Sequence, residues 1–149
     1  RDGCCGYVST RALIEHFGLT TRGLWTELNV EKETGTYPEE LYFSFHTRGL
    51  GIRVLRAPLN PKVVREHLRR NEPIILMMRC GDKKDSLLHW VAITGQYRGR
   101  YRLVDSRYVD GPIWSKIKRK QQLFAFAVGR FKNEVGAGRF ARLGDTSKW

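Results

Sequence analysis

The feature that most constrains the fold is a series of short apolar segments, most of them in the second half of the chain. Residues 73–78 (PIILMM) form a continuous apolar run, which is typical of a strand buried on both faces. Turn-forming residues separate the later segments from one another. Strands are therefore predicted over residues 52–55 (IRVL), 73–78, 88–94 (LHWVAIT), 101–105 (YRLVD) and 123–131 (LFAFAVGRF). Together they predict an antiparallel sheet.

Helical patterns dominate the first half of the chain. Residues 2–18 (DGCCGYVSTRALIEHFG) repeat apolar positions at helical spacing and end in glycine. A second helix is expected to start at Thr36, with Glu39 completing a capping box. A third is expected over residues 60–71, which open with Asn-Pro. Helices followed by an antiparallel sheet indicate an α+β domain.

Length and composition favour a single folded domain. The chain has 149 residues and 41% hydrophobic residues, enough for a core without metal or disulfide staples. No apolar run approaches the roughly 20 residues that cross a bilayer, so we expect a soluble protein with no membrane span. We expect residues 1–131 to form the domain, and the basic, glycine-rich residues 132–149 to be poorly ordered. A start at Arg1 instead of Met predicts a fragment or a processed product.

The chain is strongly basic, with a formal net charge of +12. Residues 98–149 contribute +9 of this charge, from 13 basic and 4 acidic residues. Such a field attracts acidic partners, including an acidic inhibitor protein or nucleic acid. The KIKRK run at residues 116–120 lacks the interleaved aromatics of a single-strand RNA reader, so nucleic acid is weakly supported. Ser115 is expected to cap a brief basic helix here.

Three cysteines make an odd count, which argues against a disulfide scaffold and favours a reducing site of action such as the cytoplasm. No metal site is predicted, because the cysteines and histidines lack paired ligand spacing: Cys4, Cys5 and Cys80 with His16, His46 and His67. The sequence contains neither of two glycine-rich patterns that bind nucleotide phosphates, GxxxxGK[ST] and GxGxxG. The sequence therefore predicts no cofactor.

Cys5 is the strongest candidate nucleophile. At the start of a helix, unpaired backbone N–H groups and the helix dipole stabilise a thiolate. Gly6 is expected to keep side-chain bulk away from the sulfur. The alternative is that Cys4 and Cys5 are simply small buried residues.

His89 and Asp105 are expected to meet. His89 opens one predicted strand and Asp105 closes the next, so a hairpin with its turn near Arg98 brings both to the same end of the sheet. With Cys5 they supply a thiol, an imidazole to carry its proton and a carboxylate to orient the imidazole. Alternatively, His89 is an ordinary structural histidine and Asp105 starts a turn. Trp90 is expected to pack and to shape the wall of the site.

Several segments resemble, in the same order, the papain-fold bacteriocin-processing peptidases that cut leader peptides after double glycine, with their stand-alone and toxin-domain relatives. The segments are CCGYVSTRALIEHFG, TYPEELYFSFHTRGLGIRV, EPIILMM, HWVAITG and YRLVDS. The resemblance implies a papain-like fold and a polypeptide substrate. It also implies that Cys5 is the nucleophile, that His89 is general base and acid, and that Asp105 orients it.

Candidate substrate contacts beside this triad are Cys4, Gly6 and Trp90. The chain departs from the family in having Cys4 where Asp is usual and Ser106 where Pro is usual. The family's oxyanion-stabilising Gln precedes the nucleophile by a few residues, and this sequence begins too late to include one.

Three hypotheses of function follow. The first is a cysteine-dependent hydrolase, most simply a thiol peptidase. The second is a papain-fold toxin or effector domain of a larger secreted protein, neutralised by an acidic immunity-type inhibitor. The third is an inactive module that binds a leader peptide or nucleic acid, for which binding should persist without Cys5 and decline steeply with salt.

Overall fold

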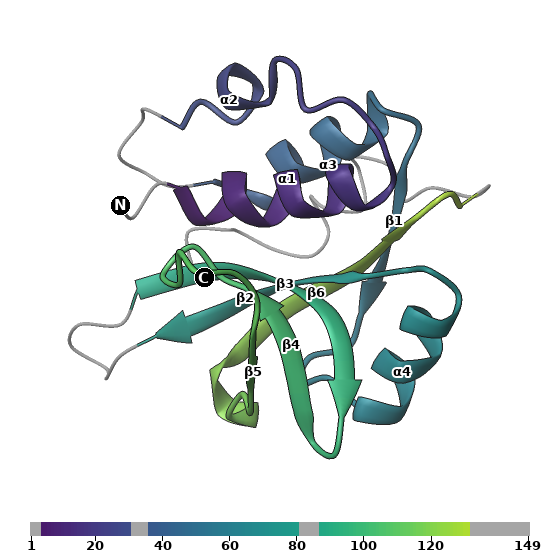
Figure 1. Ribbon diagram of the computed structural model, residues 1–149, viewed down its shortest axis with the longest axis vertical. Coiled ribbons are helices and arrows are strands. Elements are labelled where there is room, and N and C mark those ends of the chain that lie inside the picture. The colour runs from purple at the N-terminus through teal and green to yellow at the C-terminus, as the bar shows by residue number, and fades with distance from the viewer. Residues whose placement is uncertain (1–3, 31–35, 81–86, 132–149) are drawn as a thin grey trace.

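The computed structural model describes residues 4–30, 36–80 and 87–131. The predicted α+β class is confirmed: helices pack on an antiparallel sheet (Figure 1). The predicted order or disorder of residues 132–149 lies outside the described residues. In chain order the elements are α1 (Cys5–His16), α2 (Leu24–Glu27), α3 (Pro38–His46), β1 (Gly51–Leu55), α4 (Pro61–Arg69), β2 (Ile74–Cys80), β3 (Leu87–Tyr97), β4 (Arg100–Val104), β5 (Ile113–Ser115), the 3-10 helix η2 (Arg119–Gln121) and β6 (Gln122–Gly129).

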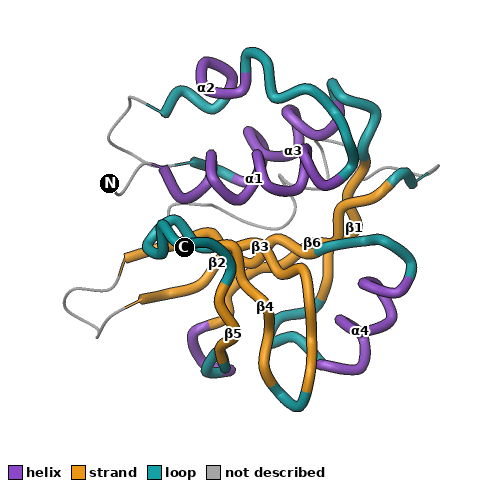
Figure 2. Tube along the Cα trace, viewed as in Figure 1, coloured by secondary structure: helices purple, strands orange, loops and turns teal. Residues whose placement is uncertain are grey.

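The strands form one six-stranded sheet in the order β1-β6-β2-β3-β4-β5. Every neighbouring pair is antiparallel, as the turn pattern predicts. The last strand, β6, returns to lie between β1 and β2, so the two halves of the chain share one sheet (Figure 2). Strand β2 therefore has a partner on each side and is buried from Ile74 to Met78. The continuous apolar run at 73–78 reflects this central place.

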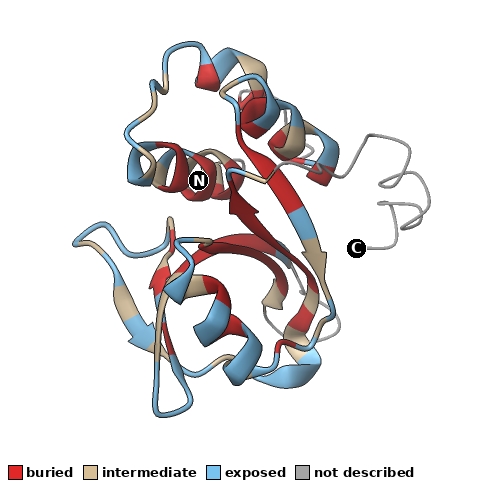
Figure 3. Ribbon diagram, turned by 90° about the vertical axis from the view of Figure 1, so that its right-hand side faces the viewer, coloured by how far each residue is buried: buried red, intermediate tan, exposed pale blue. Residues whose placement is uncertain are grey.

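Two core clusters cover the two faces of the sheet. The first core cluster joins α1, α2 and α3 to one face, and the second lies on the other face, which α4 covers (Figures 1 and 3). Strand β3 serves both, because alternate side chains point in opposite directions. Trp90 and Ala92 belong to the first cluster, and Val91 and Ile93 to the second. The middle of the apolar segment predicted at 88–94, from residue 89 to 93, is buried on both faces for this reason.

Helix α1 begins and ends where the sequence predicts. Leu13 and Ile14 are fully buried against the sheet and the neighbouring helices. Gly18 has φ of 70°, and its N–H donates to the Glu15 carbonyl at 2.9 Å. The next residue, Leu19, donates to the Ile14 carbonyl at 3.1 Å. This pair of bonds is a Schellman ending, which favours glycine at the left-handed position.

The start of α3 lies one residue later than predicted. The N-cap is Tyr37, whose backbone N–H donates to Glu40 Oε1 at 3.0 Å, so the predicted pair of Thr36 and Glu39 is wrong. Thr36 is instead buried, and its carbonyl accepts a hydrogen bond from Trp90 Nε1 at 2.8 Å. Tertiary contact with Trp90 thus takes Thr36 out of the capping role.

Ser115 does not cap a helix. It ends the edge strand β5, which pairs with β4 through Leu103 and Ile113. The only helical turn nearby in the described residues is η2, which starts four residues later. In contrast, the predicted cap at Asn60 is confirmed, because its Oδ1 accepts from the Lys62 N–H at 2.9 Å. No helix in the described ranges is long and apolar enough to cross a bilayer.

Candidate active site

Cys5 is the first residue of α1, and its side chain is almost fully buried. One helical turn later, Ser9 Oγ donates to the Trp90 carbonyl at 3.1 Å. This bond attaches the first turns of α1 to β3, directly beside His89. The Cys5 sulfur and the His89 side chain are hydrogen-bonded as a result.

His89 reaches Asp105 across the β3–β4 hairpin. Its Nε2 atom lies 2.7 Å from Asp105 Oδ1, and both side chains are buried. Ala92 pairs with Val104, and the pairing shifts by one residue nearer the turn, at a bulge. If that register continues, residue 105 lies opposite residue 91 on β3. Residues 89 and 91 point to the same face of the strand, so the Asp105 carboxylate lies on the His89 side of the sheet. The side chains that the hairpin was expected to bring together are in contact.

Arg107 holds the other side of the Asp105 carboxylate. Its Nε atom lies 3.1 Å from both carboxylate oxygens, and Nη2 donates to Oδ2 at 2.6 Å. The Arg107 backbone N–H also donates to Oδ1 at 3.0 Å. A buried carboxylate needs such partners to stay charged. Arg107 is not among the predicted site residues, and the one sequence signal near it is Asp105 as a residue that favours an Asx turn.

These contacts shift three pKa values. Burial of Cys5 opposes the thiolate, but hydrogen bonds from His89 and the Trp90 backbone, with the His89 charge, outweigh it and lower the pKa of the thiol. Burial of His89 is likewise outweighed by Asp105 and Cys5, which raise its pKa to about 9. The pKa of Asp105 is held well below its usual range by His89 and Arg107, against its burial. Both shifts favour a thiolate beside an imidazolium over a neutral thiol beside a neutral imidazole.

The three residues expected to contact substrate differ in how far they are buried and in what they contact. Gly6 faces Thr36: an added Cβ would lie 2.6 Å from Thr36 Oγ1, so packing accounts for this glycine. Trp90 is 2% exposed and contacts Phe126 edge to face, which fits the expected packing role. Cys4 is partly exposed next to the nucleophile. Substrate contact by Cys4, Gly6 or Trp90 stays a prediction.

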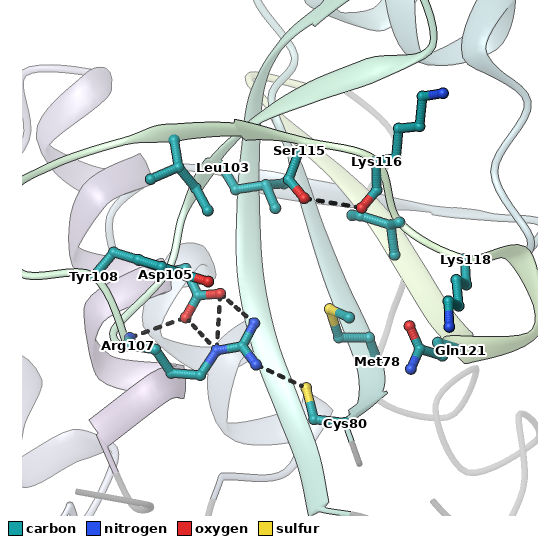
Figure 4. A pocket seen from close by; sticks show the side chains of 12 residues that line it. Met78, Cys80, Leu103, Asp105, Arg107, Tyr108, Ser115, Lys116, Lys118 and Gln121 are labelled. Carbon is teal, nitrogen blue, oxygen red and sulfur yellow. Dashed lines mark hydrogen bonds and ion pairs between the residues drawn. The ribbon is translucent and has the colours of Figure 1, made fainter. Parts of the chain in front are cut away.

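Cys80 lies beyond Arg107, at the far side of Asp105. Arg107 Nη1 donates to Cys80 Sγ at 3.4 Å (Figure 4). Burial raises the pKa of the Cys80 thiol, and the nearby Arg107 charge does not reverse this. Cys4, Cys5 and Cys80 are all free thiols. In the part of the chain that the structure describes, no group of three or more His, Cys, Asp or Glu residues is placed to hold a metal ion.

Comparison with solved structures finds a similar fold. The chain superposes with a TM-score of 0.65 on the peptidase domain of Streptococcus ComA, a bifunctional ABC transporter involved in a quorum-sensing pathway. The match covers 87% of this chain and 91% of that domain, at 14% sequence identity. No protein-family model and no curated protein matches the sequence. The chain therefore has the fold of a peptidase domain.

Proposed function

We propose that the protein is a cysteine-dependent peptidase with Cys5 as nucleophile, His89 as general base and acid, and Asp105 as the residue that orients His89. The observation that carries the proposal is the continuous series of hydrogen bonds from Cys5 through His89 to Asp105. A nucleophile, a proton carrier and an orienting carboxylate in this order are the parts that acyl transfer requires. The fold shared with a peptidase domain supports a polypeptide as the substrate.

The reaction begins with the Cys5 thiolate. Its sulfur attacks the carbonyl carbon of the scissile peptide bond and forms a tetrahedral intermediate. His89, charged at neutral pH because its pKa is raised to about 9, gives its proton to the leaving nitrogen. The C–N bond breaks, the amine product leaves, and a thioester remains on Cys5.

Water completes the cycle. Neutral His89 removes a proton from the water, whose oxygen attacks the thioester carbonyl. When the C–S bond breaks, the acid product leaves and the thiolate beside a protonated His89 is restored. Asp105 stays ionised throughout, because Arg107 and His89 both stabilise its charge.

The oxyanion of each tetrahedral intermediate needs donors near the start of α1. The backbone N–H of Cys5 is suited to this role, because Cys5 lies in the first turn of α1, at the positive end of the helix dipole. Loss of a single such donor typically costs on the order of a hundredfold in rate.

The test is cleavage of a mixed peptide library, followed by mass spectrometry, with three proteins. The wild type and Cys4→Ser are expected to cut the same peptides, and Cys5→Ala is expected to cut none. Iodoacetamide should label Cys5 before Cys4 and block cleavage. Full activity in Cys5→Ala, with its fold intact by circular dichroism, would contradict the proposal.

A further inference from the structure

A cavity of about 250 Å³ opens on the Arg107 side of Asp105. Its floor is apolar and belongs to the second core cluster, through Met78, Leu103, Ile113 and Ile117. Pockets for drug-sized ligands are commonly about 300–1,000 Å³. This cavity is smaller, so it suits a single side chain with an aliphatic stem.

The mouth of the cavity is basic. Arg107 lines one side, and Lys118 and Gln121 line the other, with Met78 between them (Figure 4). Lys118 has no ion pair among the described residues. Asp105 is the one acid among the lining residues, and its charge is already matched by Arg107 and His89. The remaining field at the mouth is positive, which favours an anionic group above the apolar floor.

Lys116 also lines the cavity but differs from Lys118 in direction. In Figure 4 its side chain extends away from Asp105 and Arg107, whereas Lys118 ends beside the Gln121 side chain. The two lysines carry the same charge and lie two residues apart. They therefore form a matched pair that separates a local contact from the general basic field.

Asp105 belongs both to the candidate triad and to the lining of the cavity. The proposed reaction indicates which half of a substrate lies near it. His89 must reach the leaving nitrogen to protonate it, so the product half that begins at that nitrogen lies on the His89 side of the sulfur. Asp105 hydrogen-bonds His89 and also lines the cavity, so the cavity adjoins the candidate triad at the residue next to His89. A substrate chain advances about 3.3–3.6 Å per extended residue. The first few residues after the scissile bond are therefore the ones for which we consider the cavity as a subsite.

We propose that this cavity is a substrate subsite for an acidic side chain, Glu above all, in the first few residues after the scissile bond. The methylene stem of the side chain packs on Met78 and Ile113, and its carboxylate meets Lys118 and Gln121. The inference rests on the proposed peptidase function. It assigns to that function a preference for acidic polypeptides, which the basic character of the chain also favours.

The first test is an NMR titration of the whole protein that does not depend on Cys5 chemistry. The probes are N-acetyl-glutamate methylamide and its glutamine counterpart, and the signals followed are the methyl groups of Met78, Ile113 and Ile117. We expect the glutamate probe to bind about three- to fivefold more tightly, the range typical of a solvent-exposed ion pair. Lys118→Gln should abolish this difference, and Lys116→Gln should preserve it. Equal affinity for both probes, or no shift at these methyl groups, would overturn the subsite.

The second test compares cleavage sites in a peptide library. Wild type and Lys116→Gln are expected to favour Glu at one of the first positions after the cut, and Lys118→Gln to lose this preference with an unchanged rate of Cys5 alkylation. Cleavage with no acidic preference overturns the subsite and leaves the peptidase proposal standing. Cleavage of no peptide contradicts the peptidase proposal, and the titration still decides whether the cavity takes an acid.

Discussion

Cys5 and Cys80 lie at opposite ends of one row of polar side chains, yet their thiol pKa values shift in opposite directions. The row runs from Cys5 through His89, Asp105 and Arg107 to Cys80. Both thiols have a cationic neighbour, and burial works against both thiolates. The pKa is lowered only at Cys5.

The difference lies in the kind of neighbour. The guanidinium next to Cys80 is committed to Asp105, whose negative charge adds to the burial that raises the Cys80 pKa. Cys5 has backbone donors as well as His89, and an imidazole can both give and take a proton near neutral pH, whereas a guanidinium keeps its protons. A nearby positive charge therefore does not by itself make a reactive cysteine here.

The largest effect is expected from His89→Ala. Without the imidazole, burial of Cys5 is no longer outweighed, so its pKa should rise and the proton carrier is lost. We expect kcat/KM to fall by about a thousandfold. His67→Gln is the control, because His67 also pairs with a carboxylate, Glu72 at 2.7 Å, but lies on α4. An equal loss in both variants would mean that folding, not chemistry, is affected.

Asp105→Asn should lower kcat/KM by about a hundredfold and change its pH profile. In the wild type, activity should rise as Cys5 loses its proton and fall as His89 loses its proton near pH 9. Asp105 raises the pKa of His89, so its neutralisation should move the alkaline limb to lower pH. The pH dependence of kcat/KM measures this. An alkaline limb that stays in place would show that Asp105 does not tune His89.

Arg107→Lys should have a smaller effect, about tenfold. Lysine keeps the charge but lacks the planar fork with which Arg107 holds both carboxylate oxygens of Asp105. Arg107→Gln, which also loses the charge, should lose more activity than Arg107→Lys. If both variants keep the wild-type rate and pH profile, Arg107 does not position Asp105 for catalysis.

Cys80→Ser is expected to change kcat/KM by less than about twofold. Within the described part of the chain its thiol makes one long hydrogen bond, from Arg107, and its raised pKa keeps it protonated at neutral pH. A loss comparable to that of His89→Ala would erase the distinction between the two thiols.

The sequence could predict the parts of this site that follow from periodicity. The hairpin between the predicted strands brings His89 and Asp105 together because register alone decides which residues meet. Gly18 marks the end of α1 because the left-handed position favours glycine.

The parts of the fold and of the site that the sequence does not predict depend on tertiary contacts. The Thr36 carbonyl accepts a hydrogen bond from Trp90 instead of Thr36 serving as the helix cap, and Ser115 belongs to a strand in which it pairs with Tyr101, fourteen residues earlier. Arg107 lies in the turn that follows β4, where no apolar period constrains a side chain. Its role follows only from the folded position of Asp105. The cavity beside it likewise joins segments whose proximity the sequence does not reveal.

The most direct test of the central claim is the pH dependence of iodoacetamide modification at each cysteine, read by peptide mass spectrometry of the intact wild-type protein. The account predicts that Cys5 reaches half its maximal rate below the pH of an ordinary cysteine, and Cys80 above it. A Cys5 midpoint equal to or higher than that of Cys80 would contradict the thiolate–imidazolium pair on which the proposed function rests.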